Sequence, residues 1–397
     1  MVEVLNSKKY KKLRNTMGNI KNKILDISSV GLTDMTGTAI VAVFWFYIAS
    51  QLGPENYGEL TYLISIASLA SGIALFGSNY TVWVMAAKKI DIQATIFLIT
   101  GISSIIGSAI VFIFLLNVGV SLVILAYVLL SLVLSDFLGK KLYRTYSKYV
   151  ITQKILMVIF GISFYYFIGE SWILIGIALS YVHMIYPLIK TAKKSKINFK
   201  LIKEKKQFII NNFAVSIGKT LYGSLDKLII APLLGFAILG NYSLGYQFFT
   251  IINLLPGTAV KYLIAQDASG IKNKKLKKIM VLASIGMAIL GSTVAPIILS
   301  LIFPKFIEAE EIIRIISWAA IPMTIQATHY LPRLWAQEKT LLILYHTIVV
   351  VVVQIFAIII FGTLYGAVGL AIAFLTTSVI GCVFIAIIDK IDRRKRN

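Results

Sequence analysis

The chain of 397 residues is 58% hydrophobic and only 14% charged, with a mean hydropathy of +0.84. Soluble domains usually carry about 25% charged residues, so the composition excludes an ordinary soluble protein and predicts a polytopic membrane protein. The net charge of +22 does not indicate a nucleic-acid partner, because Lys and Arg lie in short clusters between apolar runs, as membrane topology signals do.

Twelve apolar segments follow a basic N-terminal arm, and each has roughly the length that a helix needs to cross a bilayer. The sequence therefore predicts an all-α polytopic membrane protein with twelve transmembrane helices. We place these segments near residues 32–51, 59–84, 93–116, 119–138, 151–168, 172–189, 208–229, 236–258, 279–302, 312–332, 340–361 and 366–388.

Basic residues alternate between the two sides of the predicted membrane. All but four of the 39 Lys and Arg residues lie in the N-terminal arm, the C-terminal tail or every second connection. This count places Lys154 in the cluster that follows the fourth segment, whereas the opposite connections together hold only Lys305. The positive-inside rule then predicts a multi-pass cell-membrane protein with both termini in the cytoplasm.

The longest connection divides the chain into two sets of six segments. We predict an N-terminal six-helix bundle at 1–190, a cytoplasmic basic linker at 191–207 and a C-terminal six-helix bundle at 208–397. A shift of 182 positions favours an internal duplication, although a chance match of common residues is the alternative. That shift aligns Leu52-Gly53 with Leu234-Gly235, Gly58 with Gly240, and Thr61 with Ser243.

The seventh segment carries polar side chains on one helical face. Asn212, Ser216, Lys219 and Asp226 share this face, and Tyr222 lies beside it. An unpaired charge at the centre of a membrane helix costs about 2.5–3.5 kcal/mol, so this stripe is expected to face a partner or a hydrated cavity.

Three of these side chains are candidates for a substrate site. We predict that Lys219 binds a phosphate, with Asn212 and Tyr222 near it. Asp226 is a candidate for coupling to a proton or sodium ion, and its alternative is a pair with Lys227 or a helix cap.

Other segments offer further candidates for such a site. Asp34 is either a helix-start carboxylate at the interface or a cavity residue facing Lys219. Tyr246 and Gln247 lie on a polar face that suits sugar binding or, alternatively, helix–helix hydrogen bonding. Arg314 either snorkels to the surface or meets a head group.

We find no motif for an enzyme, a cofactor or a metal. The chain has a single cysteine, and its three histidines lie in separate apolar segments.

Three stretches resemble polysaccharide flippases of the MOP (multidrug/oligosaccharidyl-lipid/polysaccharide) exporter superfamily. Residues 51–61, QLGPENYGELT, resemble the first turn of that family. Residues 224–246 resemble its seventh span and the turn after it, with Asp226-Lys227 in the D-[RK] position. Tyr143-Arg144 resembles its arginine-bearing segment, which makes Arg144 a further candidate. The resemblance implies a MATE-like fold of two six-helix bundles.

The same resemblance implies a function. A flippase of this family would move a polyprenyl-(pyro)phosphate-linked oligosaccharide from the cytoplasmic to the outer leaflet by alternating access, for surface polysaccharide biosynthesis. Its partners would be membrane lipids and glycan-assembly proteins.

Two alternatives remain at this point. One is a multidrug or cation antiporter of the same superfamily, and the other is a non-transporting scaffold of a glycan-synthesis complex. A carrier of cationic drugs is expected to favour buried acids, so the buried lysine favours an anionic cargo.

Overall fold

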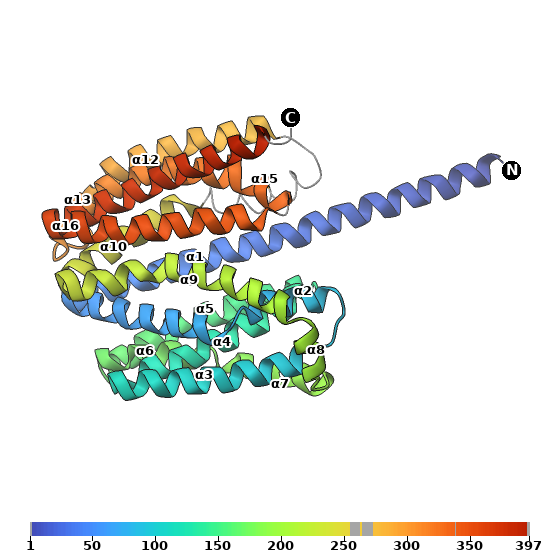
Figure 1. Ribbon diagram of the computed structural model, residues 1–397, viewed down its shortest axis with the longest axis horizontal. Coiled ribbons are helices and arrows are strands. Elements are labelled where there is room, and N and C mark those ends of the chain that lie inside the picture. The colour runs from blue at the N-terminus through green and yellow to red at the C-terminus, as the bar shows by residue number, and fades with distance from the viewer. Residues whose placement is uncertain (1, 255–262, 264–272, 338, 395–397) are drawn as a thin grey trace.

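The computed structural model describes residues 2–254, 263, 273–337 and 339–394, and only the backbone of residues 2–29, 336 and 340. Within these ranges every regular element is a helix, and the long helices run back and forth in one bundle (Figure 1). The first group of helices is α1 (Val2–Ala74), α2 (Ser78–Ala87), α3 (Gln93–Leu115), α4 (Val118–Gly139), α5 (Tyr143–Phe167), α6 (Ile173–Leu179), α7 (Ile185–Lys194) and α8 (Phe199–Glu204). The remaining helices are α9 (Lys206–Leu234), α10 (Phe236–Ile252), α12 (Lys274–Ile302), α13 (Ile307–Ile316), α14 (Ala320–Ile325), α15 (Leu331–Ala336) and α16 (Thr340–Arg394).

The helices agree with the predicted twelve membrane passes. Among the described residues, seven stretches are long and apolar enough to cross a membrane, and two of them, Val30–Ala74 and Leu341–Arg394, have the length of two passes each. Helices α9 and α10 and the broken run from α13 to α15 supply three more. The protein is therefore an all-α, multi-pass membrane protein.

Two glycines that the internal match aligns adopt the same backbone conformation. Gly53 interrupts α1 with φ 74° and ψ 177°, and Gly235 separates α9 from α10 with φ 89° and ψ 167°. These positive φ values favour glycine, because a Cβ atom would clash with the backbone. We call the end of the bundle that holds these two turns the Gly53 end; both chain ends point to the opposite end (Figure 1).

Residues that the internal match pairs also touch each other across the molecule. A Cβ atom added to Gly58 would lie 1.9 Å from the carbonyl oxygen of Phe236, and one added to Gly240 would lie 1.9 Å from that of Pro54. The hydroxyl oxygens of Thr61 and Ser243 are 3.1 Å apart. Such reciprocal contacts are typical of a twofold relation. We call this contact between α1 and α10 the glycine seam.

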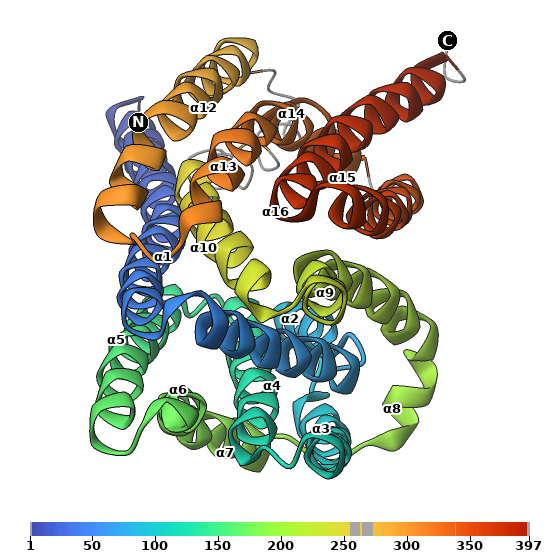
Figure 2. The same ribbon diagram turned by 90° about the vertical axis from the view of Figure 1, so that its left-hand side faces the viewer.

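The helices fall into two groups with α1, α9 and α10 between them. Figure 2 shows α3 to α7 on one side and α12 to α16 on the other. An aromatic cluster strengthens the join near the Gly53 end, where the ring of Phe46 lies 4.6 Å from that of Phe248 and 5.7 Å from that of Phe303.

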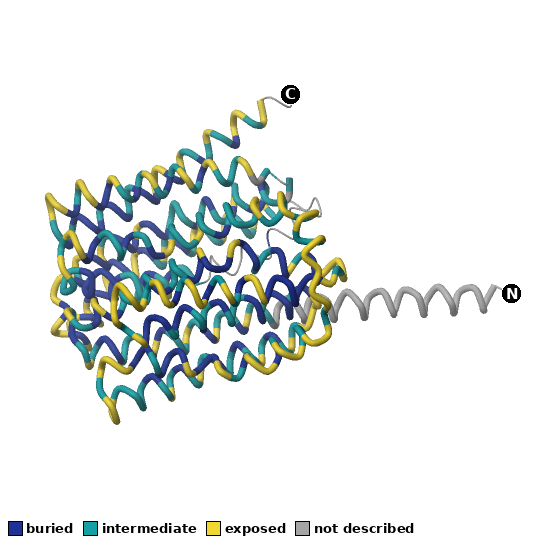
Figure 3. Tube along the Cα trace, turned by 60° about the horizontal axis from the view of Figure 1, so that its bottom comes forward, coloured by how far each residue is buried: buried dark blue, intermediate teal, exposed yellow. Residues whose placement is uncertain are grey.

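Large apolar side chains cover much of the outer surface. Exposed positions recur along the long helices (Figure 3), and many of them are Ile, Leu or Phe, such as Ile113, Phe114 and Leu301. An apolar surface of this extent is expected to face lipid rather than water.

Candidate functional site

A cavity of about 270 Å³ lies between α1, α4, α9 and α10. One charged side chain, Lys227, is among its lining residues. Hydroxyl groups of α1, α9 and α10 and aromatic rings line the rest. We call this space the Lys227 cavity; it is lined by Trp45, Tyr57, Thr61, Ile64, Ser65, Ser68, Tyr127, Gly223, Ser224, Lys227, Ser243, Tyr246 and Gln247.

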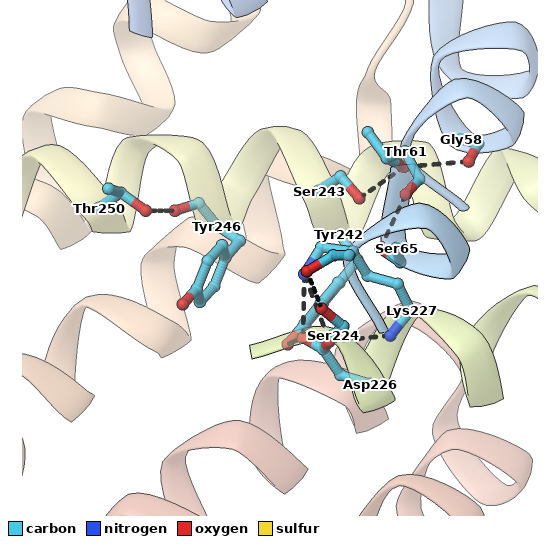
Figure 4. A network of polar contacts seen from close by, with 11 residues as sticks. Gly58, Thr61, Ser65, Ser224, Asp226, Lys227, Tyr242, Ser243, Tyr246 and Thr250 are labelled. Carbon is cyan, nitrogen blue, oxygen red and sulfur yellow. Dashed lines mark hydrogen bonds and ion pairs between the residues drawn. The ribbon is translucent and has the colours of Figure 1, made fainter. Parts of the chain in front are cut away.

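Lys227 is held in this cavity by a buried carboxylate. Its Nζ lies 3.3 Å from Oδ1 of Asp226, and it also lies 5.0 Å from the centre of the Tyr246 ring. The hydroxyl of Tyr242 donates to Oδ2 of Asp226 at 3.0 Å (Figure 4). Both Asp226 and Tyr242 are buried, so the carboxylate fixes the ammonium in place while its own second oxygen is satisfied.

A second cavity, of about 370 Å³, lies between α1, α4, α5 and α10. It contains Asp34, whose carboxylate accepts a hydrogen bond of 3.0 Å from the Tyr146 hydroxyl. It also contains the polar residues Gln153, Lys154 and Thr250. We call it the Lys154 cavity; its other lining residues are Gly37, Thr38, Val41, Trp45, Leu130, Leu134, Val150 and Gln247.

Two polar groups of the Lys154 cavity have no hydrogen-bond or ion-pair partner in the part of the chain that the structure describes. No described side chain accepts a hydrogen bond or forms an ion pair within 4.0 Å with the Lys154 ammonium, although Asp34 acts on it electrostatically. Gln153 donates to the Ser180 hydroxyl at 3.1 Å, but its buried Oε1 has no partner in the described structure. A buried polar group without a partner costs about 1–3 kcal/mol, so these groups indicate a place for a polar ligand.

The two cavities share Trp45 and Gln247 and lie at different depths. Lys227 precedes the Gly235 turn by eight residues, or about 12 Å of helix, whereas Asp34 precedes Gly53 by nineteen, or about 28 Å. The two cavities thus follow one another along the bundle, and we call them together the polar path; Thr61 and Ser243 of the glycine seam line the cavity nearer the Gly53 end.

The structure corrects the predicted position of Lys219. Its Nζ lies 2.7 Å from the Tyr80 hydroxyl and 5.7 Å from the centre of the Trp335 ring. The side chain is exposed and lines neither the Lys227 nor the Lys154 cavity. Lys219 turns toward α2 and α15, so the alternative interpretation in which Asp34 faces it across a cavity does not hold; phosphate binding by Lys219 stays a prediction.

Four other predicted residues also lie outside both cavities. Asn212 donates to the Thr81 hydroxyl at 3.2 Å, and the exposed Arg314 pairs with Glu310 at 2.7 Å. Arg144 is exposed at the start of α5, and Tyr222 is half-buried on α9. Their predicted contact with a substrate in a central chamber therefore has no support from these positions.

Three predicted residues line the two cavities, and Asp226 lies next to the Lys227 cavity. Tyr246 lines the Lys227 cavity, Gln247 lines both cavities, and Asp34 lines the Lys154 cavity. Asp226 forms the pair with Lys227 that was its alternative interpretation; ion coupling by Asp226 stays a prediction.

Sequence reasoning missed the two lysines that the cavities contain. Lys227 follows Asp226 directly and was read as its partner, and Lys154 was counted among the topology-setting residues. The structure shows why Lys154 was missed. Helix α5 begins at Tyr143 rather than near 151, so this lysine lies in the fourth turn of a helix and not in a connection.

No family model and no curated protein matches the sequence. Solved structures do match. The lipid II flippase MurJ in an inward closed conformation aligns with a TM-score of 0.71 at 15% identity, over 91% of this chain and 87% of that chain. An inward-facing multidrug resistance MATE family transporter of the MOP superfamily aligns at 0.66 with 11% identity, over 94% and 99%.

The chain has the MOP-superfamily transporter fold. A MOP superfamily transporter from Pyrococcus furiosus, described as having a binding pocket of reverse polarity, also aligns, with a TM-score of 0.62 at 14% identity over 92% and 95% of the two chains. The predicted MOP/MATE-like fold of twelve helices is thus confirmed. The polysaccharide-flippase family within that superfamily stays a prediction, because this degree of identity shows the fold alone.

Proposed function

We propose that this protein is a flippase that carries a lipid-linked oligosaccharide across the cell membrane, with its phosphate or pyrophosphate bound by the polar path. The cargo would move from the cytoplasmic to the outer leaflet for surface polysaccharide biosynthesis, with both termini in the cytoplasm. The two predicted six-helix bundles, within 1–190 and 208–397, would move against each other, so that the site opens to one side of the membrane at a time. Glycan-assembly proteins would supply the cargo and take it onward.

The observation that carries this proposal is the Lys154 ammonium, which lies in a cavity of about 370 Å³ and has no hydrogen-bond or ion-pair partner within 4.0 Å among the described residues. A lysine inside a membrane domain is costly unless it meets an anion or water. A phosphate oxygen fits the ammonium as an acceptor, and Gln153 lies beside it in the cavity wall.

The Lys227 cavity suits the sugar part of such a cargo. Trp45, Tyr127 and Tyr246 offer aromatic faces, and the hydroxyls of Ser65 and Ser224 offer donors and acceptors. Since a cytoplasmic lipid carrier presents its sugar ahead of its phosphate, the sugar would reach the deeper Lys227 cavity while the phosphate stays at Lys154.

The similarity to MurJ, which is named as a lipid II flippase, agrees with a lipid-linked cargo. The similarity to multidrug transporters favours the antiporter as the second candidate, and Asp34 is the acid that could receive a cationic drug. The Tyr146 hydroxyl already donates to Asp34, which favours the anionic cargo.

Replacement of Lys154 with Met tests the proposal. We expect flipping of a fluorescent polyprenyl-pyrophosphate sugar in proteoliposomes to fall about 10- to 100-fold, since a hydrogen bond to a charged group contributes about 1.5–3 kcal/mol. The melting temperature is expected to change little, because the ammonium loses its electrostatic interaction with Asp34 but no hydrogen bond or close ion pair to a described residue. Dithionite quenching of the outer-leaflet probe measures the rate.

Lys148 provides the matched control, because it is exposed on the same helix and lines neither cavity. Lys148→Met is expected to keep flipping within about twofold, as surface changes usually do little. Full activity of Lys154→Met would refute the phosphate role. Absence of flipping by the wild-type protein would favour the scaffold, and uptake of a cationic dye that Asp34→Asn abolishes would favour the antiporter.

A second prediction concerns the glycine seam. The hydroxyl oxygens of Thr61 and Ser243 are 3.1 Å apart, so cysteines at both positions would be within reach of a disulfide. In a Cys382→Ser background, oxidation of the Thr61→Cys/Ser243→Cys protein should stop flipping, and reduction should restore it. Unchanged flipping by the cross-linked protein would mean that α1 and α10 do not separate during transport.

A third prediction follows from the position of Lys219. Because this side chain lies outside both cavities, Lys219→Met is expected to keep flipping within about threefold, as expected of a substitution away from the site. The same proteoliposome assay measures it. A loss as large as that of Lys154→Met would show that Lys219 contacts the cargo in another conformation.

A further inference from the structure

The basic linker, residues 191–207, connects the two halves and has an unusual surface. Ile197 and Phe199 are 57% and 58% exposed, although most of the linker's other residues are polar or charged. Six of its lysines are exposed, and Glu204 is its only acidic residue. The exposed lysines are Lys193, Lys194, Lys196, Lys200, Lys203 and Lys206.

Contacts with the bundle hold this linker at the end of α3. The Ser195 hydroxyl accepts a hydrogen bond from the backbone N–H of Ala94 at 3.2 Å, and the Asn198 N–H donates to Thr95 Oγ1 at 2.8 Å. Ala94 and Thr95 lie in the first turn of α3, a membrane-crossing helix. Ile197 and Phe199 therefore lie at the level where that helix leaves the bilayer.

The neighbouring helix α7 carries a second marker of the membrane interface. Tyr186 is 66% exposed, and the ammonium of Lys190 lies 5.6 Å from the centre of its ring. Aromatic and basic side chains of this kind gather at the boundary between lipid tails and head groups. The linker therefore begins at that boundary.

Helix α8 has one side that packs on the protein and one side that is exposed. Leu201 and Ile202 pack on the buried cluster that includes Leu75 and Ile96. Lys200 and Lys203 are exposed, as is Phe199. Packing inside the protein therefore accounts for Leu201 and Ile202, whereas no described part of the chain covers Ile197 and Phe199.

We propose that the basic linker is a binding surface for anionic phospholipids of the adjoining leaflet. Ile197 and Phe199 would enter the head-group region, and the exposed lysines would contact lipid phosphates. Clusters of four to eight basic residues next to a membrane helix attract anionic lipid, with contributions that add for each residue. Apolar side chains beside them increase the affinity by insertion.

This surface would control the position of α9. The linker ends where α9 begins, at Lys206, and α9 carries Asp226 and Lys227 of the cavity. Anionic lipid would thus hold the cytoplasmic end of α9 near α3. The proposal concerns the membrane and not the cargo, so it stands or fails separately from the flippase function.

A spin label at position 199 tests this proposal. Cys382 is the single cysteine, so Cys382→Ser with Phe199→Cys gives one labelling site in the full-length protein. We expect the label to become inaccessible to a water-soluble nickel complex, and accessible to oxygen, in vesicles of phosphatidylcholine mixed with phosphatidylglycerol. In phosphatidylcholine alone the label should remain accessible to nickel.

Lysine variants identify the cause of the shift. Glutamine at positions 193, 194, 196 and 200 should return the label to water in the mixed vesicles, whereas arginine at the same positions should keep it in the bilayer. Glutamine at Lys274, Lys275, Lys277 and Lys278, which removes equal charge at the start of α12, should have no effect on the label.

Three results would overturn the proposal. They are a label in water in both kinds of vesicle, equal insertion with and without phosphatidylglycerol, and protection from nickel only in concentrated detergent samples. The last result would assign the surface to a second copy of this chain.

Discussion

Replacement of Lys227 with Gln is expected to abolish flipping and to destabilise the protein by about 3 kcal/mol. The loss of stability arises because Asp226, with a side chain only 4% exposed, would keep its charge without a cation. Breaking a buried ion pair on one side costs about 3–5 kcal/mol, and the hydrogen bond from Tyr242 offsets part of this. Thermal unfolding in detergent and flipping in proteoliposomes measure the two effects.

The double variant Asp226→Asn/Lys227→Gln separates stability from function. It has no uncompensated charge, so its melting temperature should return close to that of the wild-type protein, while flipping stays lost. Lys140→Gln is the matched control, because Lys140 pairs with the buried Asp136 at 2.7 Å but lines neither cavity. It should lower stability without lowering the rate per folded molecule. Flipping by the double variant would show that Lys227 does not bind the cargo.

Replacement of Gly58 with Ala is expected to have the second large effect, a loss of about 3 kcal/mol in stability. The added Cβ would lie 1.9 Å from a backbone carbonyl oxygen of α10, and a backbone atom cannot turn aside as a side chain can. Overpacking usually costs 1–3 kcal/mol, and the rigid partner places this site at the upper limit. Thermal unfolding measures the loss.

Gly286→Ala is the control, since no atom lies within 4 Å of the added Cβ. It should leave stability unchanged or raise it slightly, as Gly-to-Ala changes in helices do. Gly240→Ala should resemble Gly58→Ala, and the double variant should lose less than the sum, because one separation of α1 and α10 relieves both clashes. Strict additivity of the two losses would mean that the glycines do not share one contact.

The sequence predicts those features of the fold that depend on residues near one another in the chain. Hydrophobic length gives the spans, because crossing a bilayer needs about 20 apolar residues whatever surrounds them. The pairing of Gly58 with Gly240 was visible as a 182-residue repeat, and the structure shows that these residues touch. A sequence repeat shows which positions of the two halves are equivalent. Only the packing of the helices decides whether two equivalent positions contact each other.

The candidate site was harder to predict, as Lys219 and Lys154 show. Both lie within apolar helices, and sequence alone gives the cost of the charge but not the direction in which it points. Lys219 contacts Tyr80 and Trp335 on neighbouring helices, whereas Lys154 faces a cavity in which no described residue hydrogen-bonds to it. The rotation of each helix about its own axis decides whether its lysine faces a cavity or a neighbouring helix, and that rotation depends on contacts distant in the chain.

The sequence by itself determined the membrane class, the twelve passes and the glycine positions, because these depend on local composition and spacing. The tertiary structure alone decided which lysines line a cavity and that Asp226 holds Lys227 there. The physical reason is that a buried charge is stabilised by groups from several helices, such as Asp226 of α9 and Tyr242 of α10. Their meeting is set by packing of the whole bundle and not by the sequence around either residue.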